Sequence, residues 1–357
     1  MVKVLQLFET KEVAAVKTEN REPFITIGIA SFNYARYLSE AFEAIRNQKF
    51  RDFEILYCDD GSTDESVEII KGFIRENPDM QIRLVEAENQ GLIANKNRIL
   101  DHARGKYLMI CDADDYMAPN CLELLCGAAK EQDADCVIGA FQEVDADNKI
   151  IKTHALPKKP CKWIYTLHHG HIYRTDLVRN NGIRCLGVPD DVQYLQTIHF
   201  YSKKCVFIHT PVYFWRQHGD SVSKNFSVHK EWSPVSLWEK IVQQVIDVRL
   251  LLKEQKDVAG LEYYMVKHQL IAVIAIRANG YAAVKEQAQA IRKATLRAQP
   301  ELYRLKFFLS RIRTADTFYA KTATIVCWIM DKLRVFALAV YLRNLWMEKI
   351  AGKQTWN

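Results

Sequence analysis

The sequence predicts an α/β protein in which a doubly wound, mixed sheet is followed by an α-helical region. Over about the first two hundred residues, short β-rich runs alternate with amphipathic helical patterns, as in βαβ units that build a mainly parallel sheet. After about Val228 the strand-like runs and the Gly and Pro residues thin out, and helical periodicity continues to the end. We therefore expect two domains, residues 1–228 and residues 229–357.

The individual elements follow from the same patterns. Apolar, β-rich runs predict strands over residues 25–30, 54–58, 81–85, 107–111, 136–141 and 204–209. Apolar residues three and four apart predict crossover helices over residues 37–47, 65–76, 92–102 and 121–132. In the second domain the periodicity predicts helices over residues 236–254, 261–278, 282–297 and about 317–349. Such sheets bind ligands in the loops that follow the strands, so we expect the functional residues there.

Composition excludes several classes of protein. The 357 residues are 49% hydrophobic and 26% charged, which is typical of a globular protein with a full core. An excess of 49 basic over 43 acidic residues is too small to argue for nucleic-acid binding. The nine cysteines include no Cys-x-x-Cys pair, which favours reduced thiols over a disulfide framework or a zinc site. With neither a signal-peptide pattern nor an apolar run near ~18 residues, we expect a cytoplasmic protein.

Two loops after predicted strands are acidic. Asp112, Asp114 and Asp115 directly follow an apolar strand, and carboxylates crowded in this way repel one another unless a cation lies between them. Their hard oxygen atoms suit Mn²⁺ or Mg²⁺. Asp60 follows a second strand, where a carboxylate can accept hydrogen bonds from a base N–H or a ribose hydroxyl. Each loop also fits a simpler interpretation as a solvated turn or a helix cap, and an isolated Asp-x-Asp string favours that interpretation.

Five segments occur in a definite order along the first domain: residues 26–33, 53–64, 88–97, 105–119 and 213–223. Together they resemble the motifs of family 2 inverting glycosyltransferases of the GT-A fold. The resemblance covers residues 25–223, and several motifs in the right order and spacing are more specific than any one of them. It implies the GT-A fold, a nucleotide-diphosphate-sugar donor and a divalent metal ion.

The resemblance also implies roles for individual residues. The Mn²⁺ or Mg²⁺ ion on the donor diphosphate would be held by Asp112, Asp114 and Asp115. His218 would join them from residues 213–223, which we call the closing motif. The residues implied around the nucleotide sugar are Ser31, Asn33, Asp60, Asn89, Lys96, Asn97, Asp112, Arg216 and Ser221.

Asp191 is the implied general base. Asp190 and Asp191 stand where the family usually has Glu-Asp, and the departure at position 190 leaves the second carboxylate intact. A carboxylate within hydrogen-bond reach of the attacking hydroxyl, opposite the leaving diphosphate, would remove its proton and give inversion. Local sequence alone favours a helix cap for the helix over residues 192–202.

Three histidines lie close together in the sequence at His168, His169 and His171. Their density suggests a metal cluster, but none of the usual zinc partners stands at ligand spacing nearby. We therefore interpret residues 169–174 as a strand and turn that line the acceptor side, as the equivalent segment of the family does.

The tail is basic. From Glu301 onward it has ten Lys or Arg residues and four acidic ones, so the whole positive excess lies there. An aromatic, basic amphipathic surface can rest on an anionic bilayer, gaining about 1 kcal/mol per Lys or Arg. It can equally pack as a helical subdomain or a dimer contact. The sequence leaves open whether the tail binds the inner face of the cell membrane.

Taken together, the motifs predict a metal-dependent transfer of a sugar from a UDP-sugar to a hydroxyl of a glycan or lipid-linked oligosaccharide, in surface polysaccharide biosynthesis. A nucleotidyltransferase would show a Gly-rich basic loop after the first strand, where Ser31 and its neighbours stand instead. A catalytically degenerate domain that acts as a membrane scaffold or glycan-binding protein is the remaining alternative. The intact carboxylates of the motifs argue against it.

Overall fold

The computed structural model describes residues 11–15, 22–165, 167–185, 190–219, 235–236, 238–243, 259–276, 278, 280–312 and 318–354. The chain divides into two compact units, one of residues Met1–Leu156 and Leu167–His218, the other of Pro157–Thr166 and Gly219–Asn357. The expected domain boundary near residue 228 lies outside the described residues, and the short segment Pro157–Thr166 groups with the second unit.

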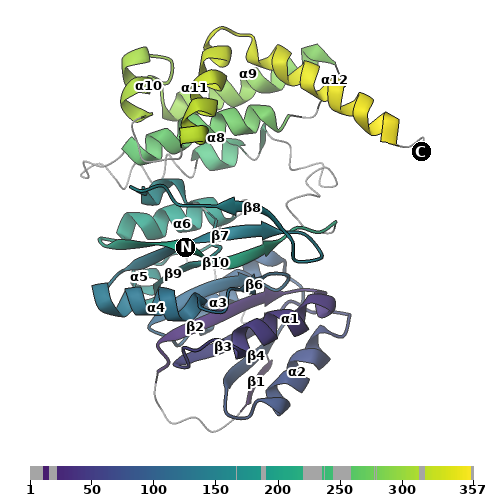
Figure 1. The fold of residues 1–357 in the computed structure, drawn as a ribbon, viewed down its shortest axis with the longest axis vertical. Helices are drawn as coiled ribbons and strands as arrows, with labels where there is room; N and C mark the ends of the chain where they lie inside the picture. Colours follow the sequence, from purple (N-terminus) through teal and green to yellow (C-terminus); the bar gives the residue numbers. More distant parts are fainter. Residues whose placement is uncertain are drawn as a thin grey trace, which may run out of the picture. The chain divides into compact units, whose positions relative to one another are not determined.

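Unit 1 alternates strands and helices (Figure 1). Its strands are β1 Lys11–Ala15, β2 Ile25–Ser31, β3 Phe53–Asp59, β4 Gln81–Glu86, β5 Tyr107–Asp112, β6 Tyr116–Met117, β7 Cys136–Val144, β8 Ile150–His154, β9 His171–Arg174 and β10 Cys205–Arg216. Its helices are α1 Ala35–Arg46, α2 Ser66–Glu76, α3 Leu92–His102, α4 Cys121–Gln132, α5 Thr175–Asn180 and α6 Asp190–Tyr201. The structure confirms the predicted α/β class and each of the six predicted strands.

Among the described residues, ten strands form one mixed sheet in the order β1-β4-β3-β2-β5-β9-β7-β10-β6, with β8 paired to β7. Strands β4, β3, β2 and β5 are parallel, and β9 is inserted antiparallel between β5 and β7. The register places Ser31 beside Asp59 and Ala30 beside Asp112. The loops that follow β2, β3 and β5 therefore leave the sheet at one edge, which is where the acidic motifs stand.

Strands β2 and β3 are buried along their whole length, as continuous apolar runs predict for strands covered on both faces. Gly28 of β2 allows α3 to pack closely, since a Cβ at this position would lie 2.2 Å from Cγ2 of Ile99. A buried carboxylate lies inside the core, where Glu54 accepts from Nε of Arg83 at 3.0 Å and from the Thr26 hydroxyl at 2.6 Å. These hydrogen bonds offset the cost of removing the carboxylate from water, which explains why an acid is tolerated inside β3.

Helix α1 begins two residues before its predicted start. Tyr34, at its N-cap, makes no side-chain cap bond. Instead, the backbone N–H of Ala35 donates to Oδ2 of Asp64 at 3.0 Å and that of Tyr34 donates to Oγ of Ser66 at 3.2 Å. The cap thus comes from the loop after β3 and the first residue of α2, which no local pattern around residue 35 could reveal.

Unit 2 is helical in its described part. It contains the short 3-10 helix η1 Lys162–Ile164 and the helices α8 Ala259–Ile274, α9 Tyr281–Ala298, α10 Leu305–Arg311, α11 Phe318–Lys332 and α12 Phe336–Gln354. The single helix expected over residues 317–349 is wrong, because Arg334 adopts a left-handed φ of 64° between α11 and α12. Part of the helix expected over 236–254 is present, and residues 244–258 lie outside the described residues. Within the described residues, no helix has the length and apolar character needed to cross a membrane.

Candidate active site

The loops after β2 and β3 are clasped together by Asn33. Its φ of 59° is left-handed, and its side-chain carbonyl accepts from the backbone N–H groups of Thr63 at 2.8 Å and Asp64 at 3.3 Å. The Asn33 backbone N–H donates to the Ser62 hydroxyl at 2.9 Å. Ser31 is buried at the end of β2, and its carbonyl accepts from the N–H of Asp60 at 3.0 Å. Both residues thus shape the edge of the sheet where a donor was expected.

Asp60 is buried and holds the start of α3. Its carboxylate accepts from the backbone N–H of Gly91 at 2.7 Å and of Gln90 at 3.1 Å, and from Nη1 of Arg98 at 2.7 Å. A carboxylate has about four acceptor positions, so three are already used by the chain itself. Asn89 lies just before this cap and is exposed.

Helix α3 contributes two further predicted residues, which point to different places. Lys96 is buried, with Nζ 3.8 Å from Oδ1 of Asp112. The Asn97 amide donates to the carbonyl of Cys185 at 2.9 Å and accepts from its N–H at 3.0 Å. Only Lys96 therefore reaches the acidic turn, which we define as residues 112–115 after β5. Asn97 instead anchors Cys185, on the chain segment that leads toward α6.

The acidic turn after β5 brings three carboxylates together. Oxygen atoms of Asp112, Asp114 and Asp115 all lie within 4.8 Å of one another. Burial and the charge of Asp112 raise the pKa of Asp114, and burial with the charges of Asp114 and Asp112 raises the pKa of Asp115 well above its usual range. Burial also opposes ionisation of Asp112, but the charges of His168 and Lys96 outweigh it and hold the pKa of Asp112 well below its usual range. A divalent cation would relieve this repulsion.

The closing motif completes the turn. Nε2 of His218 lies 2.8 Å from Oδ2 of Asp114, within hydrogen-bonding distance, so the structure brings together two of the residues expected to hold the ion. Arg216 is buried, and its Nε donates to the carbonyl of Asp114 at 2.9 Å while its backbone N–H donates to Oδ1 of Asp115 at 2.8 Å. Its guanidinium therefore braces the acidic turn. Ser221 lies outside the described residues.

Tyr213 and Glu40 also support this turn, and the sequence did not single them out. The Tyr213 hydroxyl accepts from the backbone N–H of Asp112 at 3.3 Å, and Oε2 of Glu40 accepts from Nη2 of Arg216 at 2.6 Å. Tyr213 belongs to the closing segment, but nothing in its spacing points to Asp112.

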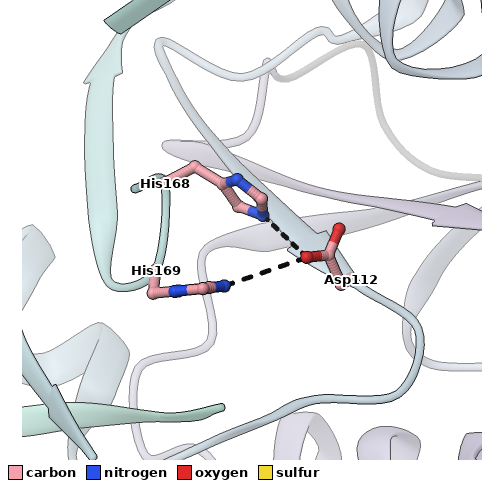
Figure 2. Close-up of side chains that lie close together, drawn as sticks. All are labelled: Asp112, His168 and His169. Carbon is pink, nitrogen blue, oxygen red and sulfur yellow. Dashed lines mark ion pairs between the residues drawn. The ribbon is translucent and has the colours of Figure 1, made fainter. Parts of the chain in front are cut away.

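Two histidines face the same turn from another part of the chain. Figure 2 shows the imidazoles of His168 and His169 directed at one carboxylate oxygen of Asp112, with Nε2 to Oδ2 distances of 3.2 Å and 3.9 Å. Asp112, which is distant in sequence, thus supplies the carboxylate that local spacing around the histidines lacks. The three residues form a group that could hold an ion, so the interpretation of this strand and turn as one without a metal stays a prediction.

Asp191 lies in the first turn of α6, so the helix predicted after residue 190 is present. Its side chain lies outside the described part of the structure, as do residues 186–189. Its role as general base therefore remains a prediction.

Comparison with known proteins agrees with the fold and with the family that the motifs resemble. The family model described as glycosyl transferase family 2 matches residues 26–205, just over half of the chain. The glycosyltransferase EpsH of Bacillus subtilis is 24% identical over 270 residues, covering 71% of this chain and 77% of EpsH. The glycosyltransferase GlyG of Streptococcus pneumoniae is 38% identical over 122 residues, which cover 34% of this chain and 40% of GlyG.

A solved structure shares the fold across most of the chain. The crystal structure of Staphylococcus aureus TarS 1-349 in complex with UDP-GlcNAc aligns with a TM-score of 0.64 and 17% identity, covering 88% of this chain and 91% of that one. At this identity the likeness concerns the fold, a mixed sheet with helices followed by a helical region. With the family model matching over half of its length, the chain belongs to glycosyl transferase family 2 and is a glycosyltransferase of the GT-A fold.

Proposed function

We propose that this glycosyltransferase moves a sugar from a UDP-sugar to a hydroxyl of a glycan acceptor, with inversion and with the help of Mn²⁺ or Mg²⁺. The observation that carries the proposal is the acidic turn after β5. It gathers three carboxylates at the edge of the sheet where ligands bind, with His218 hydrogen-bonded to one of them.

The residues present fit a divalent ion. Asp112 and Asp114 offer carboxylate oxygens and His218 offers an imidazole nitrogen, a set that suits Mn²⁺ and, through its oxygens, Mg²⁺. When bound, the ion would offset the negative charge that develops on the departing diphosphate. Lys96 adds a positive charge beside Asp112, on the same edge of the sheet. Arg216 holds the acidic turn in place through its hydrogen bonds to Asp114 and Asp115.

In the proposed transfer, the acceptor oxygen forms a bond to the anomeric carbon while the bond from that carbon to the diphosphate oxygen breaks. The hydroxyl proton passes to the carboxylate of Asp191, and the electron pair of the broken bond leaves with UDP. Attack opposite the leaving group inverts the anomeric centre.

Similar proteins and the basic tail guide the choice of donor and acceptor. The structurally similar TarS binds UDP-GlcNAc, which favours a UDP-sugar here. EpsH and GlyG are glycosyltransferases of bacteria, which agrees with an acceptor on a bacterial surface polysaccharide. The basic tail, with exposed Leu342 and Trp346 on α12, is a candidate for peripheral contact with the inner face of the membrane, where a lipid-linked acceptor would lie.

The test is a donor screen with UDP-, GDP- and dTDP-sugars, with Mn²⁺ and with EDTA, for the wild type and Asp114→Asn. We expect release of UDP from one donor, lost with EDTA and reduced at least about a hundredfold in Asp114→Asn. Asp147→Asn is the matched control, because Asp147 is an exposed acid in the β7–β8 turn. Calorimetric titration with UDP and Mn²⁺ separates a missing acceptor from a missing site. Absence of both turnover and Mn²⁺-dependent UDP binding would overturn the proposal.

A further inference from the structure

The segment that presents His168 and His169 is a tight turn leading into β9. The backbone N–H of His171 donates to the carbonyl of His168 at 3.0 Å, and Gly170 has a left-handed φ of 68°. The Gly170 carbonyl accepts from the N–H of Gly139 in β7 at 2.9 Å. Neither glycine has room for a side chain, since a Cβ would lie 2.9 Å (Gly170) or 2.3 Å (Gly139) from Cγ2 of Val212. The turn is therefore built to hold its two histidines at a definite position.

Aromatic contacts then orient the His169 ring. It is stacked on Trp215 at 4.9 Å and on Tyr213 at 5.4 Å between ring centroids, and it meets the ring of Phe141 edge-on at 5.2 Å. The His168 ring lies 4.9 Å from that of His169. Both side chains are buried, so their rings have little freedom to turn away from Asp112.

The distances between these side chains suit a metal ion. Zinc lies about 2.0–2.2 Å from histidine nitrogens and carboxylate oxygens, so two ligands of one ion are about 3.0–3.5 Å apart. Nε2 of His168 lies 3.2 Å from Oδ2 of Asp112, within this range. Nε2 of His169 lies 3.9 Å from that oxygen and 3.6 Å from Oδ2 of Asp115, so it would have to move toward Asp112 to share an ion with His168. Nζ of Lys96 lies 3.8 Å from the other oxygen, Oδ1. Both histidines approach Oδ2 (Figure 2), which is therefore the candidate ligand atom.

We propose that Asp112, His168 and His169 form a second site for a divalent transition-metal ion, distinct from the Asp114–His218 pair. Two imidazole nitrogens and one carboxylate oxygen are a ligand set for Mn²⁺, Co²⁺ or Zn²⁺ rather than for Mg²⁺, which prefers oxygen. Asp112 belongs to both groups, so ions bound at the two sites would have to share this carboxylate or compete for it. The site does not depend on the proposed sugar transfer, because it is defined by ligands and tested by binding.

The test uses Mn²⁺ alone with the full chain and pulsed electron paramagnetic resonance, which detects the coupling of a histidine nitrogen to the ion. In His218→Gln, the other group has lost its histidine. We therefore expect a nitrogen coupling to persist in this variant, and to disappear when His168→Gln and His169→Gln are added. The affinity of the remaining ion should fall by more than about tenfold on that addition. His102→Gln, at the end of α3, controls for the loss of a histidine elsewhere.

Loss of all nitrogen coupling in His218→Gln alone would overturn the proposal, as would coupling that survives the triple change. The coupling in His218→Gln alone can be measured without changing the histidine turn, which is residues 168–171. This measurement therefore tests the proposal even if the triple variant does not fold. Competition by Mg²⁺ gives a further check. A 100-fold excess of Mg²⁺ should leave the coupling in His218→Gln in place, and its displacement by Mg²⁺ would count against a nitrogen-containing site.

Discussion

Arg216 at the end of β10 is joined to Glu40 of α1 by a 2.6 Å hydrogen bond from Nη2 to Oε2. The same guanidinium donates to the carbonyl of Asp114, so one buried cation fastens the acidic turn to a neighbouring helix. The resemblance to family 2 implied a contact between this residue and the donor phosphates. In the structure the Arg216 guanidinium instead contacts groups of the protein itself, Glu40 and the Asp114 carbonyl, and its contact with the donor stays a prediction.

Replacing Arg216 with Lys should loosen the acidic turn. An ammonium group cannot reproduce the planar fork that reaches both Glu40 and the Asp114 carbonyl, so one acceptor loses its partner. We expect the free energy of unfolding to fall by about 1–3 kcal/mol and Mn²⁺ affinity to fall with it. Urea unfolding and calorimetry measure both. Glu40→Gln should lower the free energy of unfolding by less, because Glu40 is partly exposed. Equal Mn²⁺ affinity in Arg216→Lys and the wild type would contradict the bracing role.

Asn97→Ala should affect the route to α6. It removes two hydrogen bonds to the backbone of buried Cys185, which should lower the free energy of unfolding by about 1–3 kcal/mol. Because Cys185 precedes the segment that carries Asp191, we expect kcat to fall more than the KM for the donor rises. The matched control is Asn181→Ala, whose exposed amide makes one bond to the carbonyl of Leu177. A change confined to KM would instead place Asn97 in the donor pocket.

Arg83→Met should leave the Glu54 carboxylate charged and buried without its cation. Breaking one side of a buried ion pair costs about 3–5 kcal/mol, and urea unfolding would measure it. The Thr26 hydroxyl and the N–H of Arg104 still donate to Glu54, so the fold should survive. Adding Glu54→Leu should recover part of the loss. A cost below about 1 kcal/mol for the single change would show that the pair is already hydrated.

Asp331 of α11 should give unit 2 a pH-dependent stability. Burial raises the pKa of this carboxyl above its ordinary value, with Arg292 and Gln269 opposing the shift. The folded state therefore keeps a proton that the unfolded state has lost, so stability falls as pH rises from about 4 through the raised pKa. Asp331→Asn should remove this slope while keeping an acceptor oxygen for Gln269. Urea unfolding between pH 4 and 7 tests it, and equal slopes would refute the assignment.

The sequence predicted the core of unit 1 closely. Helices α3 and α4 begin and end where their periodicity indicates, and β2 to β5 differ from the predicted strands by at most a residue at either end. Fully buried strands read as continuous apolar runs, and amphipathic helices repeat every three to four residues, so both signals are local. The strand and turn expected over residues 169–174 are present, with β9 as the strand, whereas the two residues of β6 carry too little pattern to be recognised.

The site was predictable in composition but not in arrangement. The acidic turn and His218 were found because they lie in recognisable motifs. The brace by Arg216, the anchoring role of Asn97 and the approach of His168 to Asp112 depend on which strands become neighbours. Insertion of β9 between β5 and β7 is what brings the histidine turn to the acidic one, and no spacing rule along the chain encodes that insertion.

The cap of α1 has a consequence for motion. Asp64, in the loop after β3, and Ser66, the first residue of α2, hold the first turn of this helix, so the helix start and the β3–α2 connection share their hydrogen bonds. Asn33 adds a second set of bonds between the same two segments. Opening either one exposes the amides of both, so they should exchange their hydrogens with solvent as one cooperative unit. This edge of the sheet would then open as a whole to admit a ligand, or remain closed as a whole.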